Sequence, residues 1–409
     1  MVKKLEAENR NHRKLGQELE LFTSLEEAPG MPFFLPNGMV IRNELENLWR
    51  KKHQKAGYQE IKTPIMMKQE LWERSGHWDH YQENMYFSNV DNQHYSIKPM
   101  NCPGAILIFN NKRRSYRELP IRFAELGLVH RHELSGSLNG LLRVRSFTQD
   151  DAHIFARIDQ IESEIDKVLS LINEFYAHFG FEYKVELSTR PEDYMGTEEN
   201  WNQAELALES VLKDKGVQYQ VNPGDGAFYG PKIDFHIVDS LGRSWQCGTV
   251  QLDFQMPEKF DCGYIGEDNK FHRPVLIHRA IFGSVERFMA ILIEHYGGQF
   301  PLWLAPVQAK IIPIAEAHID FANEVKSQLE SGGIRIEVDY RDEKMGLKIR
   351  EAEKQKVPYM LVIGDKEMAS QSVAIRKRKE GNLGVMSIED TIQLLTKEIN
   401  GISEARIGA

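Results

Sequence analysis

Residues able to bind a phosphate, a base and a small polar molecule gather between Leu128 and Phe155. Two apolar segments flank a turn of small residues at 135–140, which predicts a strand–loop–strand hairpin. Side-chain alternation places Arg131 and Glu133 together on one face of the first strand. On the second strand, alternation places on one face Phe147, Gln149, Asp151 and His153.

Such a surface suits a nucleoside triphosphate beside a small polar substrate, because Arg makes bidentate contacts with phosphate and an aromatic ring can stack on a base. A strand face exposed to water carries the same residue types, so the pattern alone leaves that alternative open. The stretch, LVHRHELSGSLNGLLRVRSFTQDDAHIF, resembles motif 2 of class II aminoacyl-tRNA synthetases. The residues around it resemble the threonyl-tRNA synthetase family in particular.

The resemblance implies an ATP site in this hairpin. Arg131 would bind the α-phosphate and the amino-acid carboxylate, Glu133 the adenine edge and Arg143 the γ-phosphate. Phe147 would stack on adenine, and Gln149 would contact the carboxylate or carbonyl of the amino acid.

A second phosphate-binding element is the segment GSVER at 283–287, which resembles motif 3 of the same class. The resemblance implies that its glycine lets a helix begin close to ATP and that Ser284 and Arg287 bind the nucleotide. A helix N-terminus with an Arg one turn in is a sound anion site, although a capped amphipathic helix has the same pattern. Adenylate formation needs charge stabilisation at the α-phosphate, so Arg131, Arg287 and Mg²⁺ are expected to supply most of it.

Three candidate zinc ligands lie far apart in the sequence: Cys102 in KPMNCPG, His153 in DDAHIF and His278 in VLIHRA. Thiolate and imidazole are good zinc ligands, and three of them leave a fourth position open for a substrate. Taken singly, each could be an ordinary core residue, and spacing alone would not group them. The resemblance implies that together they bind one zinc ion in the catalytic site.

That zinc would explain a preference for threonine, which can chelate it through its amino and hydroxyl groups. Valine lacks the hydroxyl and would leave Asp151 unsatisfied, and such a site rejects the analogue by about 10⁴-fold or more. Serine loses only a methyl group, worth about 1–3 kcal/mol, so it should be activated by mistake. Members of the family usually carry an N-terminal editing domain for that reason, and we expect this chain to lack that region.

The adenylate pocket should have a further wall made by AFYGPK at 227–232 and by the segment 246–254. By resemblance its lining residues are Tyr229, Lys232, Gln246, Thr249 and Gln251. Tyr229 and Gln251 would bind threonine, Gln246 and Thr249 would bind ATP, and Lys232 would act in catalysis. His77 lies in a predicted loop and matches a His of the family that is implicated in aminoacyl transfer. An imidazole with a near-neutral pKa can move a proton from a ribose hydroxyl in that step.

The C-terminal segment RDEKMGLKIREAEKQKVPYMLVIGDKE resembles the anticodon-binding domain of the threonyl, prolyl, histidyl and glycyl enzymes. Matching positions imply that Arg350, Glu367 and Arg376 read anticodon bases, whose edges are exposed in a single-stranded loop. Local basic clusters at 341–356 and 376–379 are compatible with RNA, although solvated helix faces look the same. The chain departs from common residues of the family at Ala105, Asn139, Ser146 and Asp342.

Two kinds of domain must position these residues. A helix at 39–55 and a strand at 58–64 that ends at Pro64 resemble motif 1, which implies a homodimer through 39–64. A charged helical arm is expected at 1–22. Strands dominate from 85 to 155 and recur to 278, with a helix at about 158–178 between them whose apolar stripe, beginning at Ile158, is typical of a core helix rather than of a cofactor site. Strands and helices alternate after 308. We therefore predict an α/β (α+β) chain: an antiparallel-sheet class II catalytic domain at 1–300 and a mixed-sheet anticodon-binding domain at 307–409.

Composition agrees with a globular chain of two or three domains, with 41% hydrophobic and 27% charged residues among 409. Three widely spaced cysteines predict a reducing, cytoplasmic setting rather than a disulfide framework. No apolar run approaches bilayer length, and a net charge of −9 argues against nonspecific coating of nucleic acid. The resemblance implies that the partners are ATP, L-threonine and tRNA(Thr).

Three other functions fit the sequence less well. A synthetase-like protein that binds RNA for regulation would not need Arg131, Arg287 and the set of Cys102, His153 and His278. A paralogue that loads an amino acid onto another acceptor would not need the anticodon-binding domain. A zinc hydrolase would be expected to carry a short-spaced motif such as HExxH, which this sequence lacks.

Overall fold

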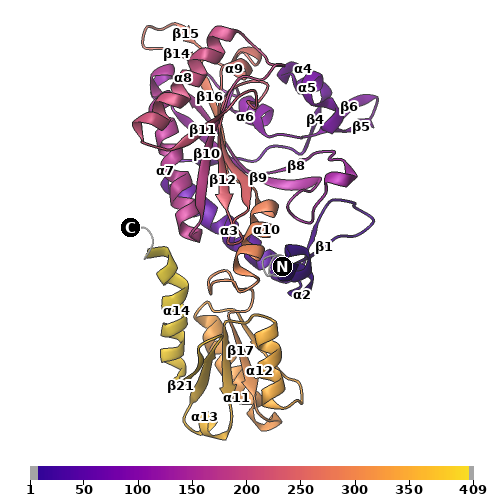
Figure 1. Cartoon of the computed structure of the whole chain (residues 1–409), viewed down its shortest axis with the longest axis vertical. Coiled ribbons are helices and arrows are strands. Elements are labelled where there is room, and N and C mark those ends of the chain that lie inside the picture. The colour runs from indigo at the N-terminus through magenta and orange to yellow at the C-terminus, as the bar shows by residue number, and fades with distance from the viewer. Residues whose placement is uncertain (1–7, 405–409) are drawn as a thin grey trace. The chain divides into compact units, whose positions relative to one another are not determined.

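The structure, a computed structural model, describes residues 8–404, and these divide into two units (Figure 1). The large-sheet unit comprises residues 24–32 and 46–291. The small-sheet unit comprises 8–23, 33–45 and 292–404. No helix among the described residues is both long and apolar enough to cross a membrane.

The large-sheet unit is built on eight strands in the order β11-β10-β12-β13-β16-β9-β8-β3. Every neighbouring pair is antiparallel except β10 with β11 and β3 with β8. The strands are β3 (Gln59–Glu60), β8 (Ile121–His130), β9 (Ser146–Ala156), β10 (Glu182–Ser188), β11 (Tyr219–Asn222), β12 (Lys232–Val238), β13 (Ser244–Asp253) and β16 (Val275–Ser284). This largely antiparallel sheet confirms the predicted fold class.

The predicted hairpin is present as β8 and β9, which pair antiparallel from Ile121 with Phe155 to His130 with Ser146. Its first strand is shorter than predicted, because Arg131 and Glu133 lie beyond the end of β8. The Arg131 amide still donates to the Arg145 carbonyl at 2.9 Å, but the chain then enters a loop with the short 3₁₀ turn η3 (Ser135–Ser137). The prediction that strand alternation aligns Arg131 with Glu133 was therefore wrong, because a loop positions both.

Two long helices contact this sheet: α7 (Ile161–Phe179) and α8 (Glu198–Asp214). The apolar stripe of α7 is buried, as predicted for a core helix rather than a cofactor site. Ile158 does not belong to that stripe, because it lies in η4 (Ile158–Gln160) ahead of α7 and is 59% exposed. Gly180 ends α7 in the left-handed region at φ 73°.

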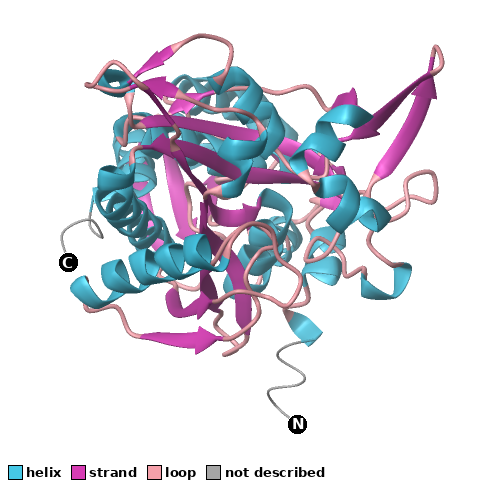
Figure 2. Cartoon of the chain, turned by 90° about the horizontal axis from the view of Figure 1, so that it is seen from above, coloured by secondary structure: helices cyan, strands magenta, loops and turns pink. Residues whose placement is uncertain are grey.

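The motif 1 region contains α3 (Pro36–Lys55), three residues longer at its start than predicted. The predicted strand at 58–64 is reduced to the two residues of β3. A three-stranded sheet follows, made of β4 (Met66–Lys68), β5 (Tyr86–Val90) and β6 (Gln93–Ile97), and its β5–β6 hairpin projects from the unit (Figures 1 and 2). A helix not predicted from the sequence, α6 (Cys102–Phe109), begins at Cys102 with proline in its first turn.

Short elements complete the large-sheet unit. They are α4 (Gln69–Ser75), α5 (His77–Tyr81), η1 (Gln82–Asn84), β7 (Arg114–Ser115), η2 (Tyr116–Glu118), α9 (Gln255–Lys259), β14 (Tyr264–Ile265), β15 (Phe271–His272) and part of α10 (Val285–Tyr296).

The larger sheet of the small-sheet unit has five strands in the order β18-β17-β19-β20-β21. The strands are β17 (Ala309–Pro313), β18 (Ile336–Val338), β19 (Tyr359–Ile363), β20 (Ser372–Lys377) and β21 (Gly381–Ser387). The first three are parallel and the last two antiparallel, so the sheet is mixed, as predicted. The helices between and after these strands are η5 (Glu316–His318), α11 (Ile319–Ser331), α12 (Met345–Lys354), α13 (Asp365–Ala369) and α14 (Ile388–Glu404), of which α13, like strand β21, was not predicted.

The predicted helical arm at 1–22 is represented by α2 (His12–Glu18), and residues 1–7 lie outside the described part of the chain. Strands β1 (Phe22–Thr23) and β2 (Phe33–Phe34) pair after it.

Candidate active site

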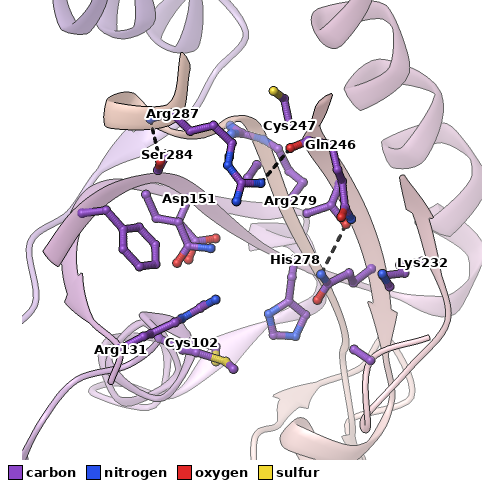
Figure 3. A pocket seen from close by; sticks show the side chains of 18 of the residues that line it. Cys102, Arg131, Asp151, Lys232, Gln246, Cys247, His278, Arg279, Ser284 and Arg287 are labelled. Atoms are coloured by element: carbon purple, nitrogen blue, oxygen red, sulfur yellow. Dashed lines mark hydrogen bonds between the residues drawn. The ribbon is translucent and has the colours of Figure 1, made fainter. Parts of the chain in front are cut away.

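A cavity of about 500 Å³ opens in the large-sheet unit (Figure 3). Sixteen of the seventeen site residues predicted in this part of the sequence line it. They are Cys102, Arg131, Glu133, Arg143, Phe147, Gln149, Asp151, His153, Tyr229, Lys232, Gln246, Thr249, Gln251, His278, Ser284 and Arg287. The exception is His77, which is not part of the lining.

Strand register explains how such distant residues meet. His278 on β16 pairs with His153 on β9 at one side and with Gln251 on β13 at the other. Two residues along, Ala280 pairs with Asp151 and with Thr249. Because residues two apart on a strand share a face, these two rows place five predicted side chains over one face of the sheet.

Cys102, His153 and His278 form a buried cluster whose candidate ligand atoms all lie within 4.8 Å of one another. The two imidazole ring centroids are 5.0 Å apart. Burial lowers the pKa of His153 well below its ordinary value, so its imidazole is neutral and keeps a lone pair. Burial, with the charges of Asp151 and Asp253, raises the pKa of the Cys102 thiol. One thiol and two imidazoles at this spacing fit the donor set of a zinc ion.

Asp151 lies beside this cluster, and a hydrogen bond from Asn101 fixes its orientation. The Asn101 Nδ2 group donates to Asp151 Oδ2 at 3.0 Å, and both side chains are buried. Gly127 on β8 leaves room for the Asn101 amide, because an added Cβ would lie 2.3 Å from Asn101 Oδ1. Burial raises the pKa of Asp151, whereas the hydrogen bond from Asn101 lowers it.

The Arg131 guanidinium is fixed between two rings and one carbonyl. Its central carbon lies 5.2 Å from the centroid of Phe147 and 5.6 Å from that of Tyr81. Its Nε donates to the Pro99 carbonyl at 3.1 Å. These contacts set the orientation of the guanidinium while leaving its terminal nitrogens available for an anion.

Arg287 extends from the start of α10, and Arg131 lies across the pocket from it (Figure 3). The Arg287 Nε and Nη1 atoms donate to the carbonyls of Leu142 and Gln246 at 3.0 and 3.1 Å, and the Arg287 backbone amide donates to Ser284 Oγ at 3.0 Å. Burial lowers the pKa of Arg287, and the charges of Arg143 and Arg131 lower it further. Several guanidinium groups facing one cavity make it suited to a polyanion.

Gly283 permits this arrangement at the end of β16. Its φ is 79°, in the left-handed region, and an added Cβ would lie 2.7 Å from the Cys247 carbonyl oxygen. Any other residue there would push the start of α10 away from β13.

The wall opposite the hairpin comes from β12, β13 and the loop before β12. Lys232 lies 2.8 Å from Asp234 and 3.1 Å from Asp225, and these charges raise its pKa although burial alone would lower it. Gln246 Nε2 donates to Asp234 at 2.7 Å, and the Tyr229 hydroxyl donates to Gln251. The polar groups of this wall are therefore held in two hydrogen-bonded groups, one around Asp234 and one around Gln251.

His77 differs from its predicted setting. It begins α5 rather than lying in a loop, and it is fully buried, with Nδ1 2.7 Å from Ser75 Oγ and Nε2 3.1 Å from Met100 Sδ. Burial, then the charges of His278 and Arg131, lower its pKa to about 3. The premise of a near-neutral pKa was wrong, because a fully buried imidazole is much harder to protonate than one in a solvated loop.

Several residues that support the site were not singled out in the sequence. Asn101 orients Asp151, Tyr81 packs on Arg131, and Asp253 lies 2.9 Å from His278 Nε2. Asn101 precedes Cys102 directly and could have been found as its neighbour, but no sequence signal pairs it with Asp151.

The three predicted anticodon residues lie on three separate elements of the small-sheet unit. Arg350 is exposed on α12, Glu367 is on α13, where it accepts the Gly364 amide at 3.0 Å, and Arg376 is on β20. Part of the predicted basic cluster is neutralised, because Arg341 contacts both Asp339 and Glu351.

Comparison with known proteins places this geometry among tRNA synthetases. Residues 86–296 match the family described as the tRNA synthetase class II core domain (G, H, P, S and T), and residues 308–398 match the anticodon binding domain. The threonine–tRNA ligases of Acetivibrio thermocellus and Clostridium tetani are 64% identical over 394 residues and 60% identical over 395 residues. These alignments cover 96% and 97% of this chain and 62% of each relative, so the chain spans about three fifths of the length of the curated relatives it matches.

Solved structures agree with these relatives. The RNA binding domain of threonyl-tRNA synthetase from Cryptosporidium parvum Iowa II is 42% identical with a TM-score of 0.92, covering 95% of this chain and 98% of that one. A putative threonyl-tRNA synthetase from Aeropyrum pernix is 30% identical with a TM-score of 0.84, covering 98% of this chain and 97% of that one.

Proposed function

This chain belongs to the threonyl-tRNA synthetase family, and from that premise we propose that it is a threonine–tRNA ligase. It would activate L-threonine with ATP to threonyl-adenylate and transfer the threonyl group to the 3′ end of tRNA(Thr). The observation that carries the proposal is that one cavity brings the Cys/His/His cluster and Asp151 together with Arg131, Arg143 and Arg287. A small hydroxylated substrate and a triphosphate can therefore meet in one place.

We propose that Cys102, His153 and His278 hold one zinc ion per subunit. Zinc, when bound, would supply open coordination positions for the amino and hydroxyl groups of threonine. The donor set and the 4.8 Å limit on the distances between its atoms support this proposal.

Asp151 would accept the threonine hydroxyl, with its carboxylate oriented by Asn101. Valine has no hydroxyl and would leave this buried acceptor unpaired, so discrimination of about 10⁴-fold or more is expected. Serine would be rejected by only about 1–3 kcal/mol, the value of a missing methyl group. Gln149, Tyr229 and Gln251 would hold the remaining polar groups of threonine.

ATP would lie along the arginines with its adenine against Phe147 and its edge toward Glu133. Arg143 would bind the γ-phosphate, and Gln246, Thr249 and Ser284 would complete the nucleotide site, with Mg²⁺ accompanying the phosphates.

In the first step, a carboxylate oxygen of threonine bonds to the α-phosphorus as the bond to the bridging oxygen breaks and pyrophosphate leaves. Arg131 and Arg287 would stabilise the charge that develops at the α-phosphate, and Lys232 would assist from the opposite wall. No protein nucleophile is required for this step.

In the second step, His77 would act close to the terminal adenosine of tRNA. Because its pKa is lowered to about 3, it would act as a neutral imidazole at physiological pH.

The small-sheet unit would bind the anticodon through Arg350, Glu367 and Arg376. Exposed side chains follow β17 and β18 in this unit, with Ile314 45% and Tyr340 53% exposed. The ring of Tyr340 can stack on an unpaired base, and Ile314 can pack against one. We propose catalytic and anticodon-binding domains at 1–300 and 307–409, a homodimer formed through 39–64, and a cytoplasmic location, where tRNA is charged.

The test is threonine-dependent ATP–pyrophosphate exchange, measured also with serine and valine and with a zinc chelator. We expect strong exchange with threonine, weaker exchange with serine, none with valine, and loss of exchange on chelation. Arg131→Ala should abolish it. Normal exchange in that variant, or no exchange with any amino acid in zinc-loaded protein, would overturn the proposal.

A further inference from the structure

Asp253, the last residue of β13, has a buried carboxylate whose two oxygens have different partners. Its Oδ1 accepts the backbone amides of Gln255 and Met256 at 2.7 and 3.0 Å. Its Oδ2 lies 2.9 Å from His278 Nε2. The carboxylate has no exposed surface, so no water competes for either oxygen.

Strand register brings this carboxylate to the histidine. Gln251 is the direct partner of His278 across β13 and β16, and Asp253 lies two residues further along the same face of β13. Diagonal neighbours of this kind are within reach of each other's side chains. The two backbone amides then fix the rotation of the carboxylate, so Oδ2 can point only toward the imidazole.

The contact determines which nitrogen of His278 carries hydrogen. An ionised carboxylate only accepts hydrogen bonds, so Nε2 must be the donor. In the neutral imidazole, Nδ1 then has the lone pair. A carboxylate that fixes a ring nitrogen in this way also fixes the orientation of the ring.

We propose that Asp253 is a positioning residue that holds His278 in the tautomer presenting Nδ1 to the metal ion. The proposal rests on the proposed function, since the ion itself is part of that function. Capping of the amides alone would require one oxygen, and an asparagine could supply it. A purely structural role does not explain the second oxygen, Oδ2, which is fully buried and paired with His278, a proposed metal ligand.

Asp253→Asn separates the two roles. With its amide oxygen on the backbone amides, the side chain turns an NH₂ group toward His278 Nε2. Nε2 must then accept, and the hydrogen moves to Nδ1, the nitrogen needed for the metal. With the amide reversed, the NH₂ group faces two backbone donors and leaves both unpaired. Either arrangement weakens the site.

The first measurement is Zn²⁺ affinity of the full chain by competition with a chromogenic chelator, together with the visible absorption spectrum of the Co²⁺-loaded protein. Asp253→Asn should bind zinc about 10–100-fold more weakly than wild type, the usual effect of losing such a partner. The matched control is Asp239→Asn, because Asp239 is also buried and accepts the amides of Leu241 and Arg243, but it does not line the cavity. That control should stay within about twofold of wild type.

A second measurement is made on wild type and does not depend on whether Asp253→Asn folds. In metal-free wild-type protein labelled with ¹⁵N-histidine, the ring nitrogens of His278 should show hydrogen on Nε2, with the signals assigned through His278→Gln. Hydrogen on Nδ1 would overturn the inference. Equal zinc affinity in wild type and folded Asp253→Asn would overturn the inference alone, whereas wild type that binds no zinc would overturn the metal site of the proposed function as well.

Discussion

Replacing Gly127 by alanine should weaken threonine activation, although Gly127 does not line the cavity. An added Cβ would lie 2.3 Å from Asn101 Oδ1 and 2.5 Å from Nδ2, where ordinary contact begins at 3.4 Å. The Asn101 amide must therefore move by about 1 Å, because atoms packed in a strand pair yield little. Its 3.0 Å hydrogen bond to Asp151 would then be lost.

The size of the effect follows from the bond that is lost. A hydrogen bond to a charged group contributes about 1.5–3 kcal/mol. If all of it acts on bound threonine in the transition state, kcat/KM for threonine should fall by about 10–150-fold. The KM for ATP should change much less, because the arginines do not contact Asn101.

Pyrophosphate exchange at varied threonine and varied ATP measures both constants. The matched control is Gly136→Ala in the same hairpin, since an added Cβ at Gly136 meets nothing within 4 Å. Asn101→Ala and the double variant with Gly127→Ala complete a double-mutant cycle, in which the double variant should be no worse than Asn101→Ala alone. Additive losses in the cycle, or a folded Gly127→Ala enzyme within twofold of wild type for threonine, would refute the reasoning.

Three further changes test other parts of the large-sheet unit. Burial raises the pKa of the Asp150 carboxyl from 3.8 to about 6, so the folded state binds this proton more tightly than the unfolded state does. The resulting stabilisation is lost as pH rises through about 6, so the free energy of unfolding of wild type relative to Asp150→Asn should fall by roughly 1.4 kcal/mol from about pH 5 to about pH 7.5. Urea denaturation measures this difference, and a difference that stays constant with pH would contradict the prediction. Lys98 and Glu125 form a buried ion pair at 3.1 Å. Lys98→Met should lower the free energy of unfolding by about 3–5 kcal/mol, because it leaves the Glu125 carboxylate buried without its partner. The double variant with Glu125→Gln should recover much of that loss, and a double variant as unstable as Lys98→Met would contradict a charge effect. Arg287→Ala should slow adenylate formation in a single turnover by about 10²–10³-fold with little change in the KM for threonine, and a loss confined to that KM would place Arg287 elsewhere in the reaction.

Local patterns in the sequence determined much of the fold. The stripe of α7, the β8–β9 hairpin and the alternation of strands and helices after residue 308 follow from side-chain periodicity, which depends on neighbours only a few residues apart. Where an element is short or set by packing, prediction failed: α6 was missed, β3 is two residues long, and Ile158 is exposed.

The candidate site was predicted through resemblance to a family rather than through spacing. Sixteen of the predicted residues line one cavity, yet Cys102, His153 and His278 come from α6, β9 and β16, and no short-range pattern links them. The sequence could name these residues, because motifs preserve residue types, but it could not state which atoms face one another.

Only the tertiary structure decided how the site is supported. Strand register pairs Asp253 with His278, packing against Gly127 holds Asn101 on Asp151, and burial lowers the pKa of His77 to about 3. Each of these depends on segments distant in the chain meeting at a fixed offset, and on the exclusion of water that follows. A sequence specifies its side chains residue by residue, whereas distance, register and desolvation exist only after the whole sheet has formed.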